Sequence, residues 1–129
     1  MSRIGSKEGF AVPKSEKQIV QDIVGFLNGL ERCRAVKNHG SVYSVAGRPD
    51  IDACFRGRHL ALEVKRPGAR PALPKEEVMR IDNALHRAWI SKGATRKQVH
   101  ELERWRKAGA LADVVTSVED VRTLIEALE

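Results

Sequence analysis

The sequence predicts an α/β fold: a small mixed β-sheet with helices on both faces. Residues 50–65 alternate apolar and polar side chains on either side of a short Gly-containing break, which is typical of a β-hairpin. Apolar residues recur with helical spacing before and after this hairpin, and residues 111–116 form a short apolar run between two such patterns. The strand, helix, strand passage after residue 65 would then be a right-handed crossover. The expected order of elements is α-β-β-β-(α)-α-β-α.

Bulk composition describes a folded, basic protein. The chain has 129 residues, 42% of them hydrophobic, which suits one domain with a real core. We expect residues 1–14 to form a flexible arm and residues 15–129 a single domain. Lys and Arg number 23 against 17 Asp and Glu, and this net charge of +6 favours a polyanionic partner through phosphate contacts. The basic surplus, together with the lack of a Gly-rich cofactor loop, disfavours a small acid–base enzyme that acts on a metabolite.

The sequence also indicates the compartment. No apolar run approaches the length of a membrane span and no signal-peptide core is present, so we expect an intracellular protein without a membrane partner. Cys33 and Cys54 lack metal-ligand spacing and are expected to be free thiols in a reducing compartment.

A first amphipathic helix is predicted from Ser15 to Leu30, because Ser15-x-x-Gln18 has the form of a capping box. Its apolar positions are Ile19, Val20, Ile23, Val24, Leu27 and Leu30. Glu16 is expected on the core-facing side, near the start of this helix. Two interpretations of Glu16 stay open: a first-turn contribution to the helix dipole, or a carboxylate aimed into an active site.

Residues 32–44 lose the helical period and suggest a first strand or a ragged hairpin that leads into Gly47-Arg48-Pro49-Asp50. His39 and Tyr43 are candidates for substrate contact, and His39 beside a glycine is equally typical of a turn. Arg48 is a candidate phosphate contact, or the ion-pair partner of a neighbouring acid.

The hairpin carries the residues with the strongest chemical signal. Pairing its two strands brings Asp50, at the start of the first, close to Glu63 and Lys65 near the end of the second. Two carboxylates about 4 Å apart repel by roughly 4 kcal/mol at an effective dielectric near 20. Protonation or a bridging divalent cation would relieve this repulsion, and carboxylate oxygens suit Mg²⁺ or Mn²⁺. The alternative interpretation is an ordinary polar face with a Glu–Lys pair, and Asp52 is a rival to Asp50 if the register shifts.

Beyond the hairpin, residues 66–71 are expected to form a stiff, basic loop in which Arg66 and Arg70 are candidate phosphate contacts. An amphipathic helix is predicted from Lys75 to Ser91, with Trp89 in the core rather than as a base-stacking platform.

The next helix, from Thr95 to Gly109, opens with Thr95-x-x-Gln98. Gln98 either closes a capping box or faces the predicted site, and both interpretations stay open. Several basic side chains follow one another here, of which Arg96 and Lys97 are candidate contacts to a phosphate backbone, although a solvated face fits them equally. A strand at residues 111–116 and a final helix opened by Ser117 complete the chain.

Pro-Asp followed across a hairpin by Glu-x-Lys resembles the PD-(D/E)xK nuclease superfamily, and the surrounding residues are similar to its VRR-NUC branch. The resemblance runs from about Ser15 onward and is carried by Glu16, Gly47, Pro49-Asp50, Glu63-Val64-Lys65 and Gln98. It implies a restriction endonuclease-like core and one or two Mg²⁺ or Mn²⁺ ions. The implied ligands are Asp50, Glu63 and the Val64 backbone carbonyl, with Glu16 as a further one.

The resemblance also implies roles for other residues. Lys65 would position or activate the attacking water, and Gln98 would assist it. Residues 70–94 depart from the pattern as a helical insert that could serve substrate recognition or dimerisation.

The resulting hypothesis is a metal-dependent DNA endonuclease, structure-selective for branched DNA such as four-way junctions and acting as a homodimer. By the same resemblance we expect it in the cytoplasm of a bacterial or phage-infected cell. The alternatives are a non-catalytic DNA-binding module on the same scaffold and a flap or general DNA nuclease.

Overall fold

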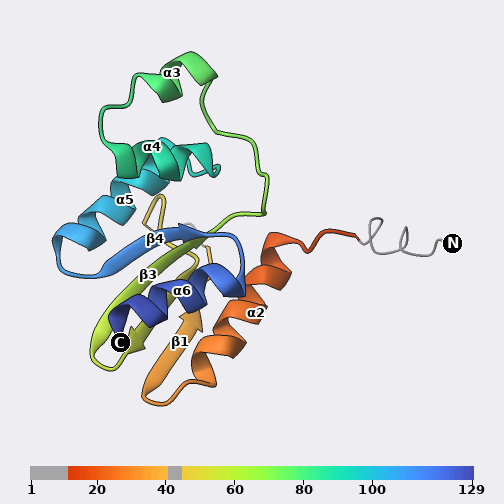
Figure 1. The fold of residues 1–129 in the computed structure, drawn as a ribbon, viewed down its shortest axis with the longest axis vertical. Helices are drawn as coiled ribbons and strands as arrows, with labels where there is room; N and C mark the ends of the chain where they lie inside the picture. Colours follow the sequence, from red (N-terminus) through yellow and green to blue (C-terminus); the bar gives the residue numbers. More distant parts are fainter. Residues whose placement is uncertain (1–11, 41–44) are drawn as a thin grey trace, which may run out of the picture.

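A four-stranded mixed sheet, in the order β1-β2-β3-β4, forms the centre of the computed structural model (Figure 1). The structure describes residues 12–40 and 45–129. Most of the expected N-terminal arm and the candidate Tyr43 therefore lie outside the described residues. The strands are β1 (Cys33–Lys37), β2 (Ile51–Phe55), β3 (Arg58–Val64) and β4 (Leu111–Val115). The helices are α2 (Glu16–Asn28), α3 (Lys75–Met79), α4 (Ala84–Ser91), α5 (Arg96–Lys107) and α6 (Val118–Leu128).

The predicted hairpin is confirmed as the antiparallel pair β2–β3. Ile51 pairs with Leu62 and Phe55 with Arg58, so the connection is a two-residue turn. Both turn residues, Arg56 and Gly57, have positive φ, as the hairpin turns that match the twist of the strands require. This register is the one that sets the start of β2 against the end of β3.

Strand β4 pairs with β3 in parallel, with Leu60 opposite Leu111 and Val64 opposite Val115. Parallel neighbours need a crossover connection, and α3, α4 and α5 provide it. Strand β1 pairs antiparallel with β2 on the other side. The mixed sheet and its flanking helices confirm the predicted α/β fold class.

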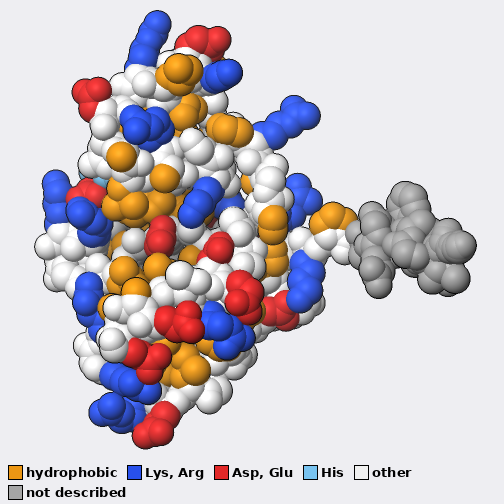
Figure 2. Space-filling view, viewed as in Figure 1, with side chains coloured by type: hydrophobic (Ala, Val, Ile, Leu, Met, Phe, Trp, Pro, Cys, Tyr) orange, Lys and Arg blue, Asp and Glu red, His pale blue; other side chains and the backbone are white. Residues whose placement is uncertain are grey.

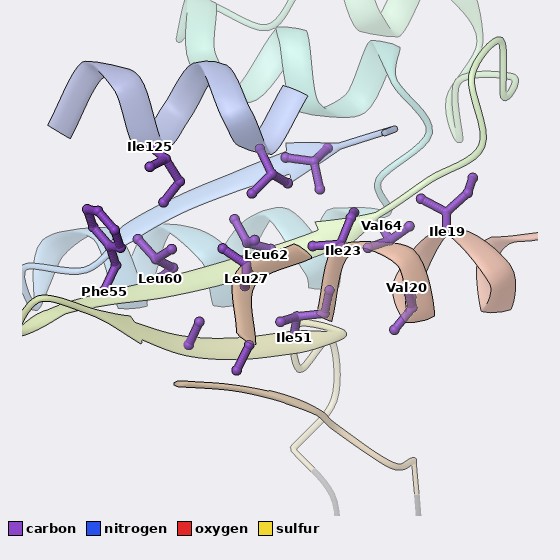
Figure 3. Close-up of a cluster of buried hydrophobic side chains, with 14 residues drawn as sticks. Ile19, Val20, Ile23, Leu27, Ile51, Phe55, Leu60, Leu62, Val64 and Ile125 are labelled. Carbon is purple, nitrogen blue, oxygen red and sulfur yellow. The ribbon is translucent and has the colours of Figure 1, made fainter. Parts of the chain in front are cut away.

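Alternation along the strands separates two apolar clusters, one on each face of the sheet. The first lies under α2 and α6, and Figure 3 shows Ile23, Leu27 and Ile125 gathered with the strand side chains of this cluster. The second lies under α4 and α5 and includes Trp89 and Leu102. Full burial of one large apolar side chain contributes roughly 1.5–3 kcal/mol, so both clusters hold their helices firmly on the sheet.

The single helix predicted from Lys75 to Ser91 is wrong, because α3 ends at Met79 and α4 begins at Ala84. Asn83 caps α4: its Oδ1 accepts the His86 backbone N–H over 3.0 Å. A side-chain cap of this kind competes with continued helix, which the apolar spacing alone did not reveal. Figure 1 shows α3 beyond α4, away from the sheet.

The sequence also predicted a buried Trp89, a capped start of α2 and two free cysteines. Trp89 is a core residue, fully buried, and its Nε1 donates to Asp113 Oδ1 over 2.9 Å. Ser15 caps α2, but Gln18 donates to Asp22 instead of completing a capping box. Cys33 and Cys54 are both free thiols. Within residues 12–40 and 45–129, no helix combines the length and apolarity needed to span a membrane.

Candidate active site

Asp50 lies directly before β2, and the residue before it, Pro49, is fully buried. Its Oδ2 accepts the backbone N–H of Val64 over 2.8 Å. This bond ties the start of one hairpin strand to the end of the other. The predicted closeness of Asp50 to the Glu63-x-Lys65 segment is therefore present in the structure.

Glu63 is a buried carboxyl, 2% exposed, on the α5 side of the sheet. Its neighbours Leu62 and Val64 belong to the cluster on the opposite face, so strand alternation turns Glu63 toward α5. Its Oε2 accepts Gln98 Nε2 over 2.9 Å and lies 3.9 Å from Lys65 Nζ. Its Oε1 is buried without a hydrogen-bond partner in the described part of the chain.

The environment of Glu63 favours its neutral form. Burial, as the largest cause, and the neighbouring negative charge of Asp50 together raise the pKa of Glu63 to about 9, while Lys65 acts in the opposite direction. A carboxyl kept neutral by desolvation and a neighbouring carboxylate is a common feature of functional sites. An added positive charge at this position would stabilise its ionised form.

Gln98 serves both of the interpretations that the sequence left open. Its Oε1 accepts the Thr95 backbone N–H over 2.9 Å, and the Gln98 backbone N–H donates to Thr95 Oγ1, so the capping box of α5 is complete. The free end of the same amide donates to Glu63. One side chain therefore closes the first helical turn and contacts the buried carboxyl.

Gly47 explains how the loop before Asp50 comes so close to α5. Its φ is +77°, and a Cβ at this position would lie 2.4 Å from the Lys97 carbonyl oxygen. Only glycine permits this conformation together with this contact. The sequence marked Gly47 as part of a motif without indicating which backbone it contacts.

Lys65 continues β3 by one backbone bond, since its N–H donates to the Val115 carbonyl over 3.0 Å. Its side chain is 14% exposed and ends beside the Glu63 carboxyl. A half-buried ammonium next to a carboxylate pair is suited to orienting a water molecule or stabilising phosphoryl charge.

The rival carboxylate Asp52 has other partners. Its Oδ1 lies 2.9 Å from His59 Nε2, and its Oδ2 accepts Asn38 Nδ2 over 2.7 Å. Glu16 is exposed at the start of α2, contrary to the core-facing position expected for it, although its charge also acts to raise the pKa of Glu63. Among the described residues, no three His, Cys, Asp or Glu side chains form a group that could hold a metal ion. Glu16 is thus not brought into one ligand cluster with Asp50 and Glu63.

The candidate DNA contacts differ in their surroundings. Arg48 donates to Asn38 Oδ1 over 2.9 Å, and Arg96 lies 3.8 Å from Glu77 Oε2. Arg66, Arg70 and Lys97 are exposed and have no ion pair within the described part of the chain. On the face that Figure 2 shows, basic and acidic side chains are interspersed. On this face the cations are separate and do not form one continuous basic patch.

Asn38 is a residue whose importance the sequence did not reveal. It lies in the stretch expected to form a first strand or a ragged hairpin, and the structure shows its backbone and side chain bonded to the Pro49–Asp50 segment. An asparagine directly after a strand is the only local signal, and it is typical of many turns.

The fold and the site together define a restriction endonuclease-like α/β protein with a Pro-Asp…Glu-x-Lys arrangement at one end of its hairpin. A solved structure titled "VRR_NUC domain protein" has the same fold, with a TM-score of 0.56 and 16% sequence identity. The likeness covers 89% of this chain and 88% of that one, so it extends across nearly all of both folds. No model of a known protein family and no curated protein matches the sequence. The chain therefore has the fold of a VRR-NUC domain.

Proposed function

We propose that this chain is a metal-dependent nuclease that hydrolyses DNA phosphodiester bonds. The observation that carries the proposal is the convergence of Asp50, Glu63 and Lys65 at one end of the β2–β3 hairpin. Their arrangement places two carboxyls and an ammonium together in a partly buried position. The structural likeness to a protein titled VRR_NUC domain protein adds support at the level of the fold.

The donor set fits Mg²⁺ or Mn²⁺. Asp50 and Glu63 supply hard oxygen ligands, and the Val64 carbonyl would be a third. Glu63 Oε1 is buried without a partner in the described part of the chain, which is the kind of atom that a cation satisfies. A small protein ligand set suits Mg²⁺, which usually keeps several waters and binds substrate phosphate. Because Glu16 is exposed and lies outside this group, we leave it out of the proposed ligands.

The side chains then have distinct tasks. A bound cation would neutralise charge on the scissile phosphate and lower the pKa of a coordinated water. Val64 N–H holds the Asp50 carboxylate, and Gln98 holds the Glu63 carboxyl. Lys65, 3.9 Å from Glu63, would orient the attacking water or stabilise negative charge on the phosphoryl oxygens.

DNA would be held through its phosphates. Arg66, Arg70 and Lys97 are exposed and unpaired within the described residues, which leaves them available to phosphate oxygens. Arg48 and Arg96 would contribute from the ion pairs they already make. We further propose a homodimer that prefers branched DNA such as four-way junctions, because a two-fold dimer suits a two-fold substrate.

The test is cleavage of a labelled four-way junction beside linear duplex and flap DNA, with Mg²⁺, Mn²⁺ or EDTA. Asp50→Asn and Lys65→Ala should each abolish cutting, whereas Asp82→Asn and Lys92→Ala, which change exposed side chains, should leave it intact. Paired symmetric nicks in the junction, together with a dimer in sedimentation, would support junction resolution. Salt-sensitive DNA binding without cutting in any metal would contradict the nuclease and favour a non-catalytic DNA-binding module.

A further inference from the structure

We propose that Asn38 is a positioning residue for Asp50, a role that rests on the proposed function. Asn38 follows β1 directly, and its backbone N–H donates to the Asp50 carbonyl over 2.7 Å. Its side-chain Nδ2 donates to the Pro49 carbonyl over 2.9 Å. One residue thus holds both peptide carbonyls of the Pro49–Asp50 segment.

Asp50 needs such support because it stands outside the regular strand pairing. The last residue pair between β1 and β2 is Lys37 with Ile51, so the regular pairing ends one residue short of Asp50. Its side chain accepts a hydrogen bond from Val64 and faces the neighbouring Glu63 carboxyl. When Glu63 is ionised, as a metal ligand must be, repulsion between the two carboxylates would push Asp50 away unless its backbone is fixed. The bonds from Asn38 supply that fixation.

The Asn38 side chain is itself held at both ends. The second N–H of its Nδ2 points to Asp52 Oδ2 at 2.7 Å, and its Oδ1 accepts from Arg48 over 2.9 Å. Every polar atom of the amide therefore has a partner, which removes its rotational freedom. Asp52 orients Asn38 and acts on Asp50 through it, a task distinct from metal ligation.

The contacts extend from Asp52 to α5. His59 Nε2 lies 2.9 Å from Asp52 Oδ1, and the His59 ring meets the Trp105 ring edge-on with centroids 4.6 Å apart. The helix that supplies Gln98 to Glu63 is therefore also linked, through Asp52, to the residue that fixes Asp50. This arrangement fixes the positions of the Asp50 and Glu63 carboxyls relative to each other.

The test measures Mn²⁺ binding directly, by the loss of the free-ion signal in electron paramagnetic resonance, besides cleavage. Outer-shell substitutions typically weaken metal affinity by about 10- to 100-fold, and we expect Asn38→Ala to fall in this range. Asn28→Ala is the matched control, since the Asn28 side chain also fixes β1. Its Nδ2 donates to the Ala35 carbonyl over 3.0 Å, and its Oδ1 accepts the Ala35 backbone N–H over 2.8 Å. Both variants should lower the thermal midpoint, but only Asn38→Ala should weaken Mn²⁺ binding.

A second pair of variants, at Asp52, tests whether that residue positions Asn38 or binds the metal itself. The same pair provides the test if Asn38→Ala does not fold. Asp52→Asn keeps an acceptor for Asn38 and should retain most of the Mn²⁺ affinity, whereas Asp52→Ala should lose about 10-fold. Equal affinity in Asp52→Asn and Asp52→Ala, or wild-type affinity in Asn38→Ala, would overturn the positioning role while leaving the nuclease proposal intact. Wild-type protein that binds no Mn²⁺ would overturn both.

Discussion

The amide of Gln98 connects a helix cap to a buried carboxyl: its Oε1 accepts the Thr95 backbone N–H and its Nε2 donates to Glu63 Oε2, each over 2.9 Å. The amide can serve both because its two ends have opposite hydrogen-bonding character. The start of α5 is thereby aligned with the end of β3. Stability of the helix and placement of Glu63 are therefore coupled in one side chain, and variants can separate the two.

Gln98→Ala removes both contacts, whereas Thr95→Ala removes the side-chain cap alone. Each should cost about 1 kcal/mol in unfolding free energy, as cap substitutions usually do. Only Gln98→Ala should also slow cleavage, by roughly 10- to 100-fold, because Glu63 then loses its partner. Urea unfolding and single-turnover cleavage measure the two effects, and equal cleavage rates in the two variants would contradict a site role for Gln98.

Gly47→Ala should be far more damaging than an alanine at another glycine with positive φ. Gly57 has φ +88° and open space around its Cβ position, so Gly57→Ala carries only the conformational cost, about 1–2 kcal/mol. At Gly47 the new Cβ would also meet the Lys97 carbonyl, adding about 1–3 kcal/mol of overpacking. Calorimetry of the two variants checks this difference, and equal thermal midpoints would disprove the close approach to α5.

Glu63 predicts a pH dependence of stability for the metal-free protein. Its carboxyl has a pKa of about 9 in the folded state, against an ordinary value of 4.5. Between these values the folded state keeps a proton that the unfolded state releases, so the unfolding free energy falls as pH rises. The slope is at most about 1.4 kcal/mol per pH unit. The contribution of Glu63 is complete below pH 4.5 and is lost as the pH rises toward 9.

Urea unfolding in EDTA from pH 5 to pH 8 measures this slope. Glu63→Gln should flatten it, and Glu101→Gln, at a second carboxyl that is buried in the described part of the chain, is the control that should not. Addition of Mg²⁺ or Mn²⁺ at pH 8 should stabilise the wild type and release a proton, since the ligand must be ionised. An unchanged slope in Glu63→Gln would show that another group is responsible.

The exposed cations near the site predict a graded salt dependence of DNA binding. Each of Arg66→Ala, Arg70→Ala and Lys97→Ala should reduce the slope of log affinity against log salt by about 1. Arg122→Ala is the control, because Arg122 lies on α6, paired with Glu119 at 3.1 Å. Fluorescence anisotropy in EDTA at several salt concentrations measures the slopes. An equal loss in all four variants would indicate a general charge effect instead of contacts near the site.

Much of the fold could be predicted from local pattern. Period-two alternation located the hairpin and, with it, the meeting of Asp50 with the Glu63-x-Lys65 segment. Ser15 and Thr95 marked the true starts of α2 and α5, because a capping side chain acts within three residues of its own position. The single helix predicted from Lys75 to Ser91 was wrong, because the cap at Asn83 begins a new helix and outweighs the apolar spacing around it.

The sequence by itself determined the class of fold and the residue types available for chemistry, since strand period, helix period and caps depend on close neighbours along the chain. Tertiary structure alone decided that Gln98 contacts Glu63, that Gly47 lies against Lys97, and that Asn38 holds the Pro49–Asp50 segment. It also decided that Asp52 contacts His59 and that Glu16 is exposed. These contacts join separate elements, and their geometry follows from how the helices and the two apolar clusters pack on the sheet.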